Sequence, residues 1–194
     1  GTGEGRFTQG SKNSYMSPAG RGIYRFNPAD QSYTLIPTTE TMGSGSDFSA
    51  VNKVAIYEKE GVTYFFAATN TGLYRWEIRN ESDWESRSAY SSVFSGEPVY
   101  DVAVVGNYNM IYFSTENKLY RVGNVTANTA PVDVSISNAT IFPPSAKRIY
   151  IAVAPSNPSY VYALVVNGNG LMHGVYMTKN QSTWTTLTTS TTTP

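Results

Sequence analysis

One short motif recurs four times in this chain, and its spacing constrains the fold more than any other feature. Each copy is a five-residue segment with a tyrosine at its centre, and these tyrosines lie 50, 46 and 56 residues apart. They are Tyr24, Tyr74, Tyr120 and Tyr176. The residues around them are mostly aromatic, aliphatic or β-branched, as is usual in β-strands. A recurrence of about 50 residues in strand-forming sequence predicts a series of similar β-sheet units.

The sequence around each copy predicts antiparallel strands in succession, which is the organisation of a β-propeller blade of four strands. In the second repeat, strands are predicted at Val51–Glu58, Val62–Thr69, Leu73–Ile78 and Trp84–Tyr90. The outer strand of the third repeat is predicted at Val132–Ile136, whereas the first repeat has only its third and outer strands, within Gly22–Ile36. The predicted blades occupy residues 1–37, 51–90, 99–136 and 148–189, and a tail rich in threonine and proline follows at 190–194. No segment has the apolar spacing of an amphipathic helix.

These patterns predict an all-β fold with about three and a half to four blades of four antiparallel strands. Propellers usually close with four to eight blades, and an unclosed array leaves apolar blade faces uncovered. We therefore expect the chain to be part of a larger propeller, with further blades supplied by the same chain or by another subunit. The alternative is a small four-bladed ring closed by its own termini.

The composition argues against several classes of function. Acidic and basic residues number 14 each, so the chain lacks the basic character of a nucleic-acid-binding protein. It has no cysteine, and hence no disulfide or thiolate site. No apolar run reaches the roughly 18 residues that a membrane-spanning helix needs. The charged fraction of 14% and the 15 tyrosines are typical of exported β-proteins, so we expect an extracellular, cell-surface or periplasmic location in a bacterium.

The last repeat resembles a known family of propeller blades. Residues 151–163 (Ile-Ala-Val-Ala-Pro-Ser-Asn-Pro-Ser-Tyr-Val-Tyr-Ala) are similar to the blade opening of sortilin-like and Asp-box propellers. Residues 174–184 resemble the Asp-box, or BNR repeat, whose usual pattern is Ser-x-Asp-x-Gly-x-Thr-Trp. The box is degenerate here and lacks one residue before the tryptophan; its counterparts are Thr178, Asn180, Ser182 and Trp184.

The resemblance implies a fold rather than an activity. The box is structural, and it occurs in sialidases, other glycoside hydrolases, sortilin-type receptors and bacterial surface proteins. It implies that Asn180 caps the turn between the third and outer strands, and that Trp184 packs between blades.

Arginine follows the tyrosine in three of the four copies, at Arg25, Arg75 and Arg121. Sialidases gather three arginines around a substrate carboxylate, so these residues are candidates for such a site. A residue repeated at one blade position would instead lie within the wall, with its stem packed between blades and its head paired. We favour this second interpretation for the arginines and for the repeated tyrosines, since Met177 replaces arginine in the fourth copy.

Asp101 is the candidate for a catalytic acid, because it begins a predicted inner strand near the axis where propellers often bind ligands. A glycosidase needs a second carboxylate at a defined separation, and the corresponding position in the previous blade is near Lys53. His173 is the only histidine, and no nucleophile motif accompanies it. The turn at residues 167–170 lacks the carboxylates of a calcium loop. No cofactor or metal site is therefore predicted.

Together these features predict a non-catalytic scaffold that binds protein or glycan through the loops of one propeller face. One alternative is a glycoside hydrolase of the sialidase or Asp-box glucanase type, whose catalytic acids lie largely outside this segment. Another is a structural subunit of a bacterial surface or secretion assembly, which a large apolar flank covered by another chain would favour.

Overall fold

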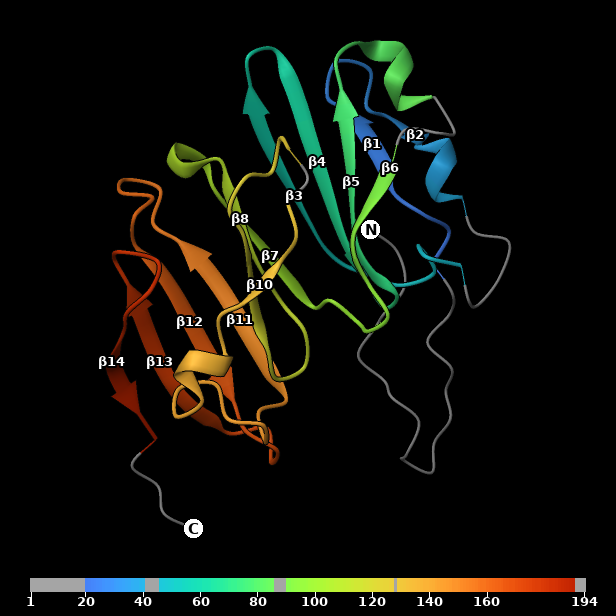
Figure 1. The fold of residues 1–194 in the computed structure, drawn as a ribbon. Helices are drawn as coiled ribbons and strands as arrows, with labels where there is room; N and C mark the ends of the chain where they lie inside the picture. The colour runs from blue at the N-terminus through green and yellow to red at the C-terminus, as the bar shows by residue number, and fades with distance from the viewer. Residues whose placement is uncertain (1–19, 41–45, 86–89, 128, 191–194) are drawn as a thin grey trace, which may run out of the picture. The chain divides into compact units, whose positions relative to one another are not determined.

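The computed structural model describes residues 20–40, 46–85, 90–127 and 129–190 (Figure 1). The part of the predicted first blade before Gly20 and most of the predicted tail therefore lie outside the described residues. The chain divides into two compact units, Gly1–Pro98 and Val99–Pro194, and each is described by itself.

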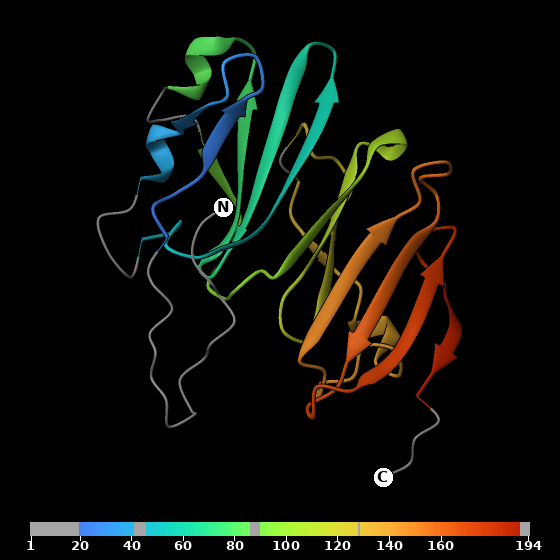
Figure 2. The same ribbon diagram turned by 180° about the vertical axis from the view of Figure 1, so that it is seen from behind.

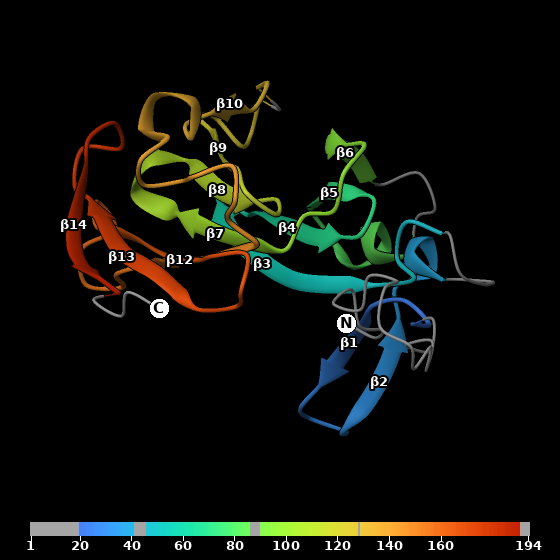
Figure 3. The same cartoon turned by 90° about the horizontal axis from the view of Figure 1, so that it is seen from below.

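The first unit contains a hairpin and a four-stranded antiparallel sheet, which Figure 3 shows as separate sheets. The hairpin consists of β1 (Tyr24–Asn27) and β2 (Ser32–Leu35). The sheet is formed by β3 (Val51–Lys59), β4 (Val62–Thr69), β5 (Gly72–Ile78) and β6 (Tyr90–Ser95), in that spatial order. Within the described residues, the first repeat thus supplies two strands and the second repeat four.

The second unit contains two four-stranded antiparallel sheets, in each of which consecutive strands are neighbours (Figures 1 and 2). The first comprises β7 (Asp101–Val105), β8 (Met110–Ser114), β9 (Leu119–Val122) and β10 (Val132–Asp133). The second comprises β11 (Arg148–Val153), β12 (Val161–Val166), β13 (Met172–Thr178) and β14 (Trp184–Thr189). The predicted all-β fold of four-stranded antiparallel blades is confirmed.

Short 3-10 helices interrupt the strands, and the described residues include no α-helix. The 3-10 helices are η1 (Pro37–Thr39), η2 (Glu81–Trp84), η3 (Gly106–Tyr108) and η4 (Ile136–Asn138).

The outer strand predicted at Trp84–Tyr90 does not begin at Trp84, which belongs to η2; residues 86–89 lie outside the described residues, and β6 runs from Tyr90 to Ser95. The cause is local hydrogen bonding. The Asn80 side chain accepts from the Ser82 N–H at 3.0 Å, and the Asp83 carboxylate accepts from the Asn80 N–H at 3.1 Å. This capping box begins a helical turn at the point where a strand was expected.

The outer strand of the third repeat is also shorter than the predicted Val132–Ile136. Strand β10 ends at Asp133, whose carboxylate accepts from the Ser135 N–H at 2.9 Å. A side chain that bonds to the backbone two residues later forms a turn, and the turn ends the strand.

Aromatic residues dominate the core of the first unit, and in the second unit they pack among aliphatic residues. In the first unit, the Phe48 ring lies 5.3 Å from Tyr74, 5.4 Å from Trp76 and 5.4 Å from Tyr90. In the second unit, Trp184 is buried together with Phe142, Tyr112 and the aliphatic residues of β11 and β12. These cores lie on the faces of the sheets, as expected where one sheet packs on another.

The glycine that begins three of the four motifs is required by crowding. A Cβ atom on Gly72 would lie 2.1 Å from the Phe94 carbonyl oxygen, and one on Gly22 would lie 2.5 Å from the Thr39 carbonyl oxygen. A Cβ atom on Gly174 would lie 2.5 Å from the Tyr176 hydroxyl. The motif therefore marks a position at which a neighbouring group approaches the third strand too closely for a side chain.

Candidate functional site

The repeated tyrosines are packing residues in three of the four copies. Tyr74, Tyr120 and Tyr176 are 5%, 8% and 2% exposed, whereas Tyr24 is 40% exposed. The Tyr74 hydroxyl lies 3.0 Å from the Thr71 hydroxyl, and burial raises the pKa of Tyr74 to about 12. Tyr24 is more exposed than the other three because it lies on the hairpin, where only two strands of the blade are described.

The repeated arginines are each held by a partner of their own. Arg25 forms an ion pair with Glu81, with its guanidinium 5.3 Å from the Trp84 ring. Arg75 is buried and lies 2.9 Å from the Glu77 carboxylate. Arg121 donates to the carbonyl of residue 181 at 3.2 Å. Each of the three guanidinium groups therefore has a contact within the protein, although the Arg25 side chain is still 38% exposed.

Asparagine side chains organise the turn after the third strand in every sheet. Asn180 accepts from the N–H groups of Ser182 at 3.1 Å and Thr183 at 2.8 Å. Asn80 accepts from the Ser82 N–H, and Asn27 and Asn124 accept from backbone N–H groups two residues later. The pattern Asn-x-Ser-x-Trp at 80–84 and again at 180–184 is the signal in the sequence that could have predicted this turn in both repeats.

In two of these turns, the residue after the asparagine binds the arginine of the preceding sheet. Glu81 binds Arg25 in the first unit, and the carbonyl of Gln181 accepts from Arg121 and from the Tyr112 hydroxyl, at 3.4 Å, in the second. Burial raises the pKa of Tyr112 to about 12, against the opposing effect of Arg121, so its hydroxyl keeps its proton well into the alkaline range. The turn therefore has two roles, one within its own sheet and one in joining two sheets.

Replacing Asn180 by alanine is expected to lower the free energy of unfolding of the second unit by about 1 kcal/mol, because two backbone N–H groups lose their acceptor. Urea denaturation followed by circular dichroism measures this change. The Asn180→Asp variant keeps an acceptor oxygen and should retain most of the stability. Equal losses in the two variants would contradict a capping role.

The Asp101 side chain is buried and bonds to the backbone of a neighbouring sheet. It begins β7, is 3% exposed, and its carboxylate accepts from the Ile151 N–H at 2.8 Å. On the neighbouring strand, the Ser114 hydroxyl donates to the Ile149 carbonyl at 2.7 Å. Both bonds join the sheet β7–β10 to the backbone of β11.

A solvent-facing hollow of about 350 Å³ lies on the sheet β11–β14. It is lined by Asn167, Asn169, Leu171, Met172, His173, Thr189 and Ser190. The Asn167 side chain shapes the turn before β13 by accepting from the N–H groups of Asn169 and Leu171, at 3.0 and 3.1 Å. The other wall comes from the end of β14, which the register places opposite the start of β13.

The lining of this hollow is both polar and apolar. Its lining combines amide and hydroxyl groups with the apolar side chains of Leu171 and Met172, which are both exposed. The His173 imidazole lies 3.3 Å from the Thr140 carbonyl. Groups of this kind can hydrogen-bond a neutral polar ligand and cover its apolar parts.

Metal-binding clusters and membrane-spanning helices are both absent from the described parts of the chain. No group of three or more His, Cys, Asp or Glu residues in these parts is arranged to hold a metal ion. None of the helices found there has the length and apolar character to cross a membrane.

The sequence matches no family model and no curated protein. Several solved structures match this chain, and three of them are as follows. A chain of a nidogen/laminin complex has a TM-score of 0.54 and 8% identity, over 90% of this chain and 60% of that chain. An auxiliary nutrient binding protein from Bacteroides thetaiotaomicron has a TM-score of 0.48 and 14% identity, over 87% of this chain and 41% of that chain. An alpha-L-arabinofuranosidase from Podospora anserina, in complex with cellotriose, has a TM-score of 0.41 and 13% identity, over 76% and 49%.

The chain thus spans between 41% and 60% of the length of these structures. At such low identity the likeness shows the fold alone. The chain is an all-β protein with blades of the β-propeller type.

Proposed function

We propose that this chain is a non-catalytic β-propeller scaffold of an exported bacterial protein, which binds protein or glycan outside the cell or at its surface. The observation that carries the proposal is the position of Asp101. Its carboxylate is buried and bonded to the Ile151 N–H, so the best candidate for a catalytic acid has a structural contact instead. The repeated arginines support the same conclusion, since each has a protein partner.

The hollow lined by residues 167–173, 189 and 190 is the proposed binding surface. Its amides and hydroxyls suit the hydroxyl groups of a sugar, and Leu171 and Met172 suit the apolar face of a sugar ring or of a peptide side chain. It lies on a turn at the end of a rigid sheet, a place where binding residues often occur.

The test is calorimetric titration of the chain with a panel of neutral oligosaccharides. Leu171→Asp is expected to weaken binding by about tenfold, which corresponds to about 1.4 kcal/mol. The matched control is Val132→Asp, since Val132 is an equally exposed apolar residue of the same unit, on β10. Binding that Leu171→Asp leaves unchanged would exclude this hollow. Hydrolysis of a glycan that is lost in Asp101→Asn while thermal unfolding is unchanged would instead support the alternative of a glycoside hydrolase.

A structural role in a surface or secretion assembly is the second candidate. The observation that favours it is the apolar and partly exposed outer face of the sheet β11–β14.

A further inference from the structure

The sheet β11–β14 is buried on one face only. In the other two four-stranded sheets, the central strands are buried almost throughout, as in β4, β5, β8 and β9. In β12 and β13, buried residues alternate with partly exposed ones. The buried side includes Ile151, Ala163 and Tyr176. The partly exposed side, here called the Met177 face, includes Tyr150, Tyr162, Leu164, Val175 and Met177, with Arg148 stacked on the Tyr150 ring at its edge.

The Met177 face corresponds to the face of the sheet β7–β10 that the sheet β11–β14 covers. The strand pairings align Tyr120 with Tyr176, because Tyr120 pairs with Phe113 as Tyr176 pairs with Ala163. By this alignment Tyr112 corresponds to Tyr162, and Leu119 corresponds to Val175. Tyr112 and Leu119 belong to the core in which the sheet β7–β10 packs on the sheet β11–β14. The Met177 face is therefore the side on which a sheet of this series receives the next one.

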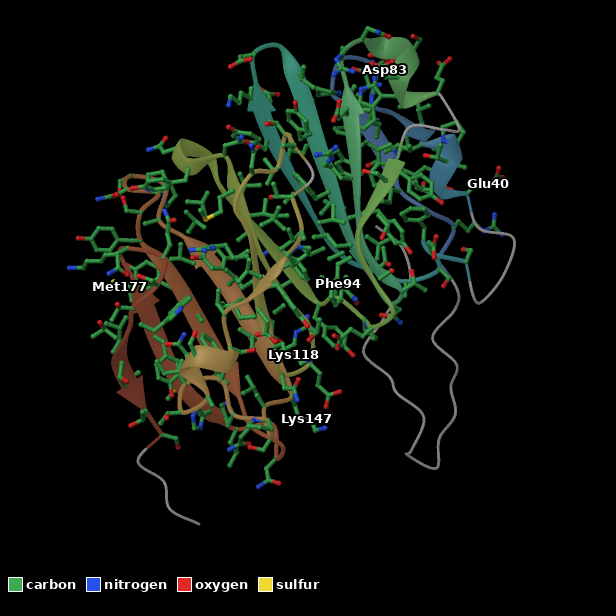
Figure 4. The ribbon with its side chains drawn as sticks, viewed as in Figure 1. Glu40, Asp83, Phe94, Lys118, Lys147 and Met177 are labelled. Carbon is green, nitrogen blue, oxygen red and sulfur yellow. The ribbon has the colours of Figure 1, made fainter. Side chains whose placement is uncertain are left out.

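Apolar residues replace the polar groups of the existing interface. Asp101, Ser114 and Arg121 bond to the backbone of the next sheet. By the same alignment their counterparts are Tyr150, Leu164 and Met177 (Figure 4 labels Met177). The Met177 face thus has the apolar residues of a surface that another sheet covers, and the Arg148 guanidinium beside them is already held by the Tyr100 carbonyl and ring.

The hairpin carries the complementary face. Tyr24 and Phe26 point to one side of β1 and pair with Leu35 and Tyr33 of β2. Phe26 and Tyr33 are 51% and 70% exposed, with ring centroids 4.9 Å apart. Tyr24 is the counterpart of Tyr176, which is buried in the interface with the preceding sheet. The side formed by these four residues, here called the Tyr24 face, is therefore the side that receives a preceding sheet.

We propose that the Met177 face of one copy of this chain binds the Tyr24 face of a second copy, head to tail. The contact reproduces the packing of the sheet β7–β10 on the sheet β11–β14, and it centres on Val175 and Met177, which like Tyr24 lie on third strands. The Tyr24 face has no charged residue, so covering it leaves no charge without solvent. Because the two surfaces differ, the association is heterologous and produces rings or open chains of copies.

The test is sedimentation analysis of the chain and of two variants, each with one face blocked. Met177→Lys blocks one face and Phe26→Asp blocks the other, and both residues are partly or largely exposed, so the fold should survive. The wild-type mass should rise with concentration above 21.2 kDa, whereas each variant alone should remain at that mass. An equimolar mixture of the two variants keeps one intact Met177 face and one intact Tyr24 face, so it should form a pair and nothing larger. Val132→Lys, at an exposed apolar residue outside both faces, should associate like the wild type.

Three outcomes would overturn the proposal. The first is a wild-type chain of 21.2 kDa at every concentration. The second is association that persists in Met177→Lys or in Phe26→Asp alone, since a face would then bind its own kind. The third is a mixture of variants that stays monomeric while the wild type associates. Circular dichroism and thermal unfolding of each variant separate these outcomes from loss of fold.

Discussion

Replacing Trp184 by alanine is expected to lower the free energy of unfolding of the second unit by about 3–5 kcal/mol, as for other buried aromatic residues. The indole is buried, with its centroid 5.3 Å from Phe142 and 6.3 Å from Tyr112. Its removal takes apolar area from the core and leaves a cavity, because residues on two different sheets surround it. Urea denaturation monitored by circular dichroism gives the change directly.

Trp84 provides the matched control for this substitution. It follows the corresponding turn in the first unit, but it is only partly buried, beside Phe65 and beneath the Arg25 guanidinium. Trp84→Ala should therefore cost clearly less than Trp184→Ala. Equal losses would show that the shared turn, rather than burial in the core, determines the effect.

Gly72→Ala is expected to cost about 3 kcal/mol in the first unit, from overpacking and from backbone strain together. The added methyl group would meet the Phe94 carbonyl oxygen at 2.1 Å, and φ of Gly72 is +156°. Relief requires β6 to move away from β5, which breaks the pairing of Gly72 with Ser95. Thermal unfolding of the purified variant should show a lower melting temperature.

Gly123→Ala is the control, since a methyl group there has no atom within 4 Å. A substitution of this kind should change the stability by no more than about 0.5 kcal/mol. If both glycine variants behave alike, the close approach of Phe94 does not explain the glycine of the motif.

The strands were predictable where the local pattern and the global packing agree. Val62–Thr69 is rich in aromatic and β-branched residues between two turns, and β4 has these bounds. The outer strands were predicted less well, because few apolar residues mark them and turn chemistry decides where they begin. Around Trp84 the apolar residue suggested a strand, whereas the side chains of Asn80 and Asp83 stabilise a 3-10 turn. The asparagine at this point in each repeat was present in the sequence and would have predicted the turn.

The site residues were harder to place, because their partners are distant in sequence. The sequence predicted Asp101 at the start of an inner strand, but its bond to Ile151 depends on how two sheets pack, 50 residues apart. The hollow was missed for the same reason. The turn at residues 167–170 was recognised, yet its partner Thr189 comes from β14, and the irregular register of β13 with β14 decides which residues meet there.

The bonds that Asp101 and Ser114 make to β11 also bear on aggregation. Strand β11 is an edge strand of its sheet. An edge strand is where another chain can add by main-chain pairing. Here the side chains of a neighbouring sheet occupy the Ile151 N–H and the Ile149 carbonyl. The second unit can therefore present an apolar sheet face for packing while these main-chain groups of β11 are withheld from cross-β growth.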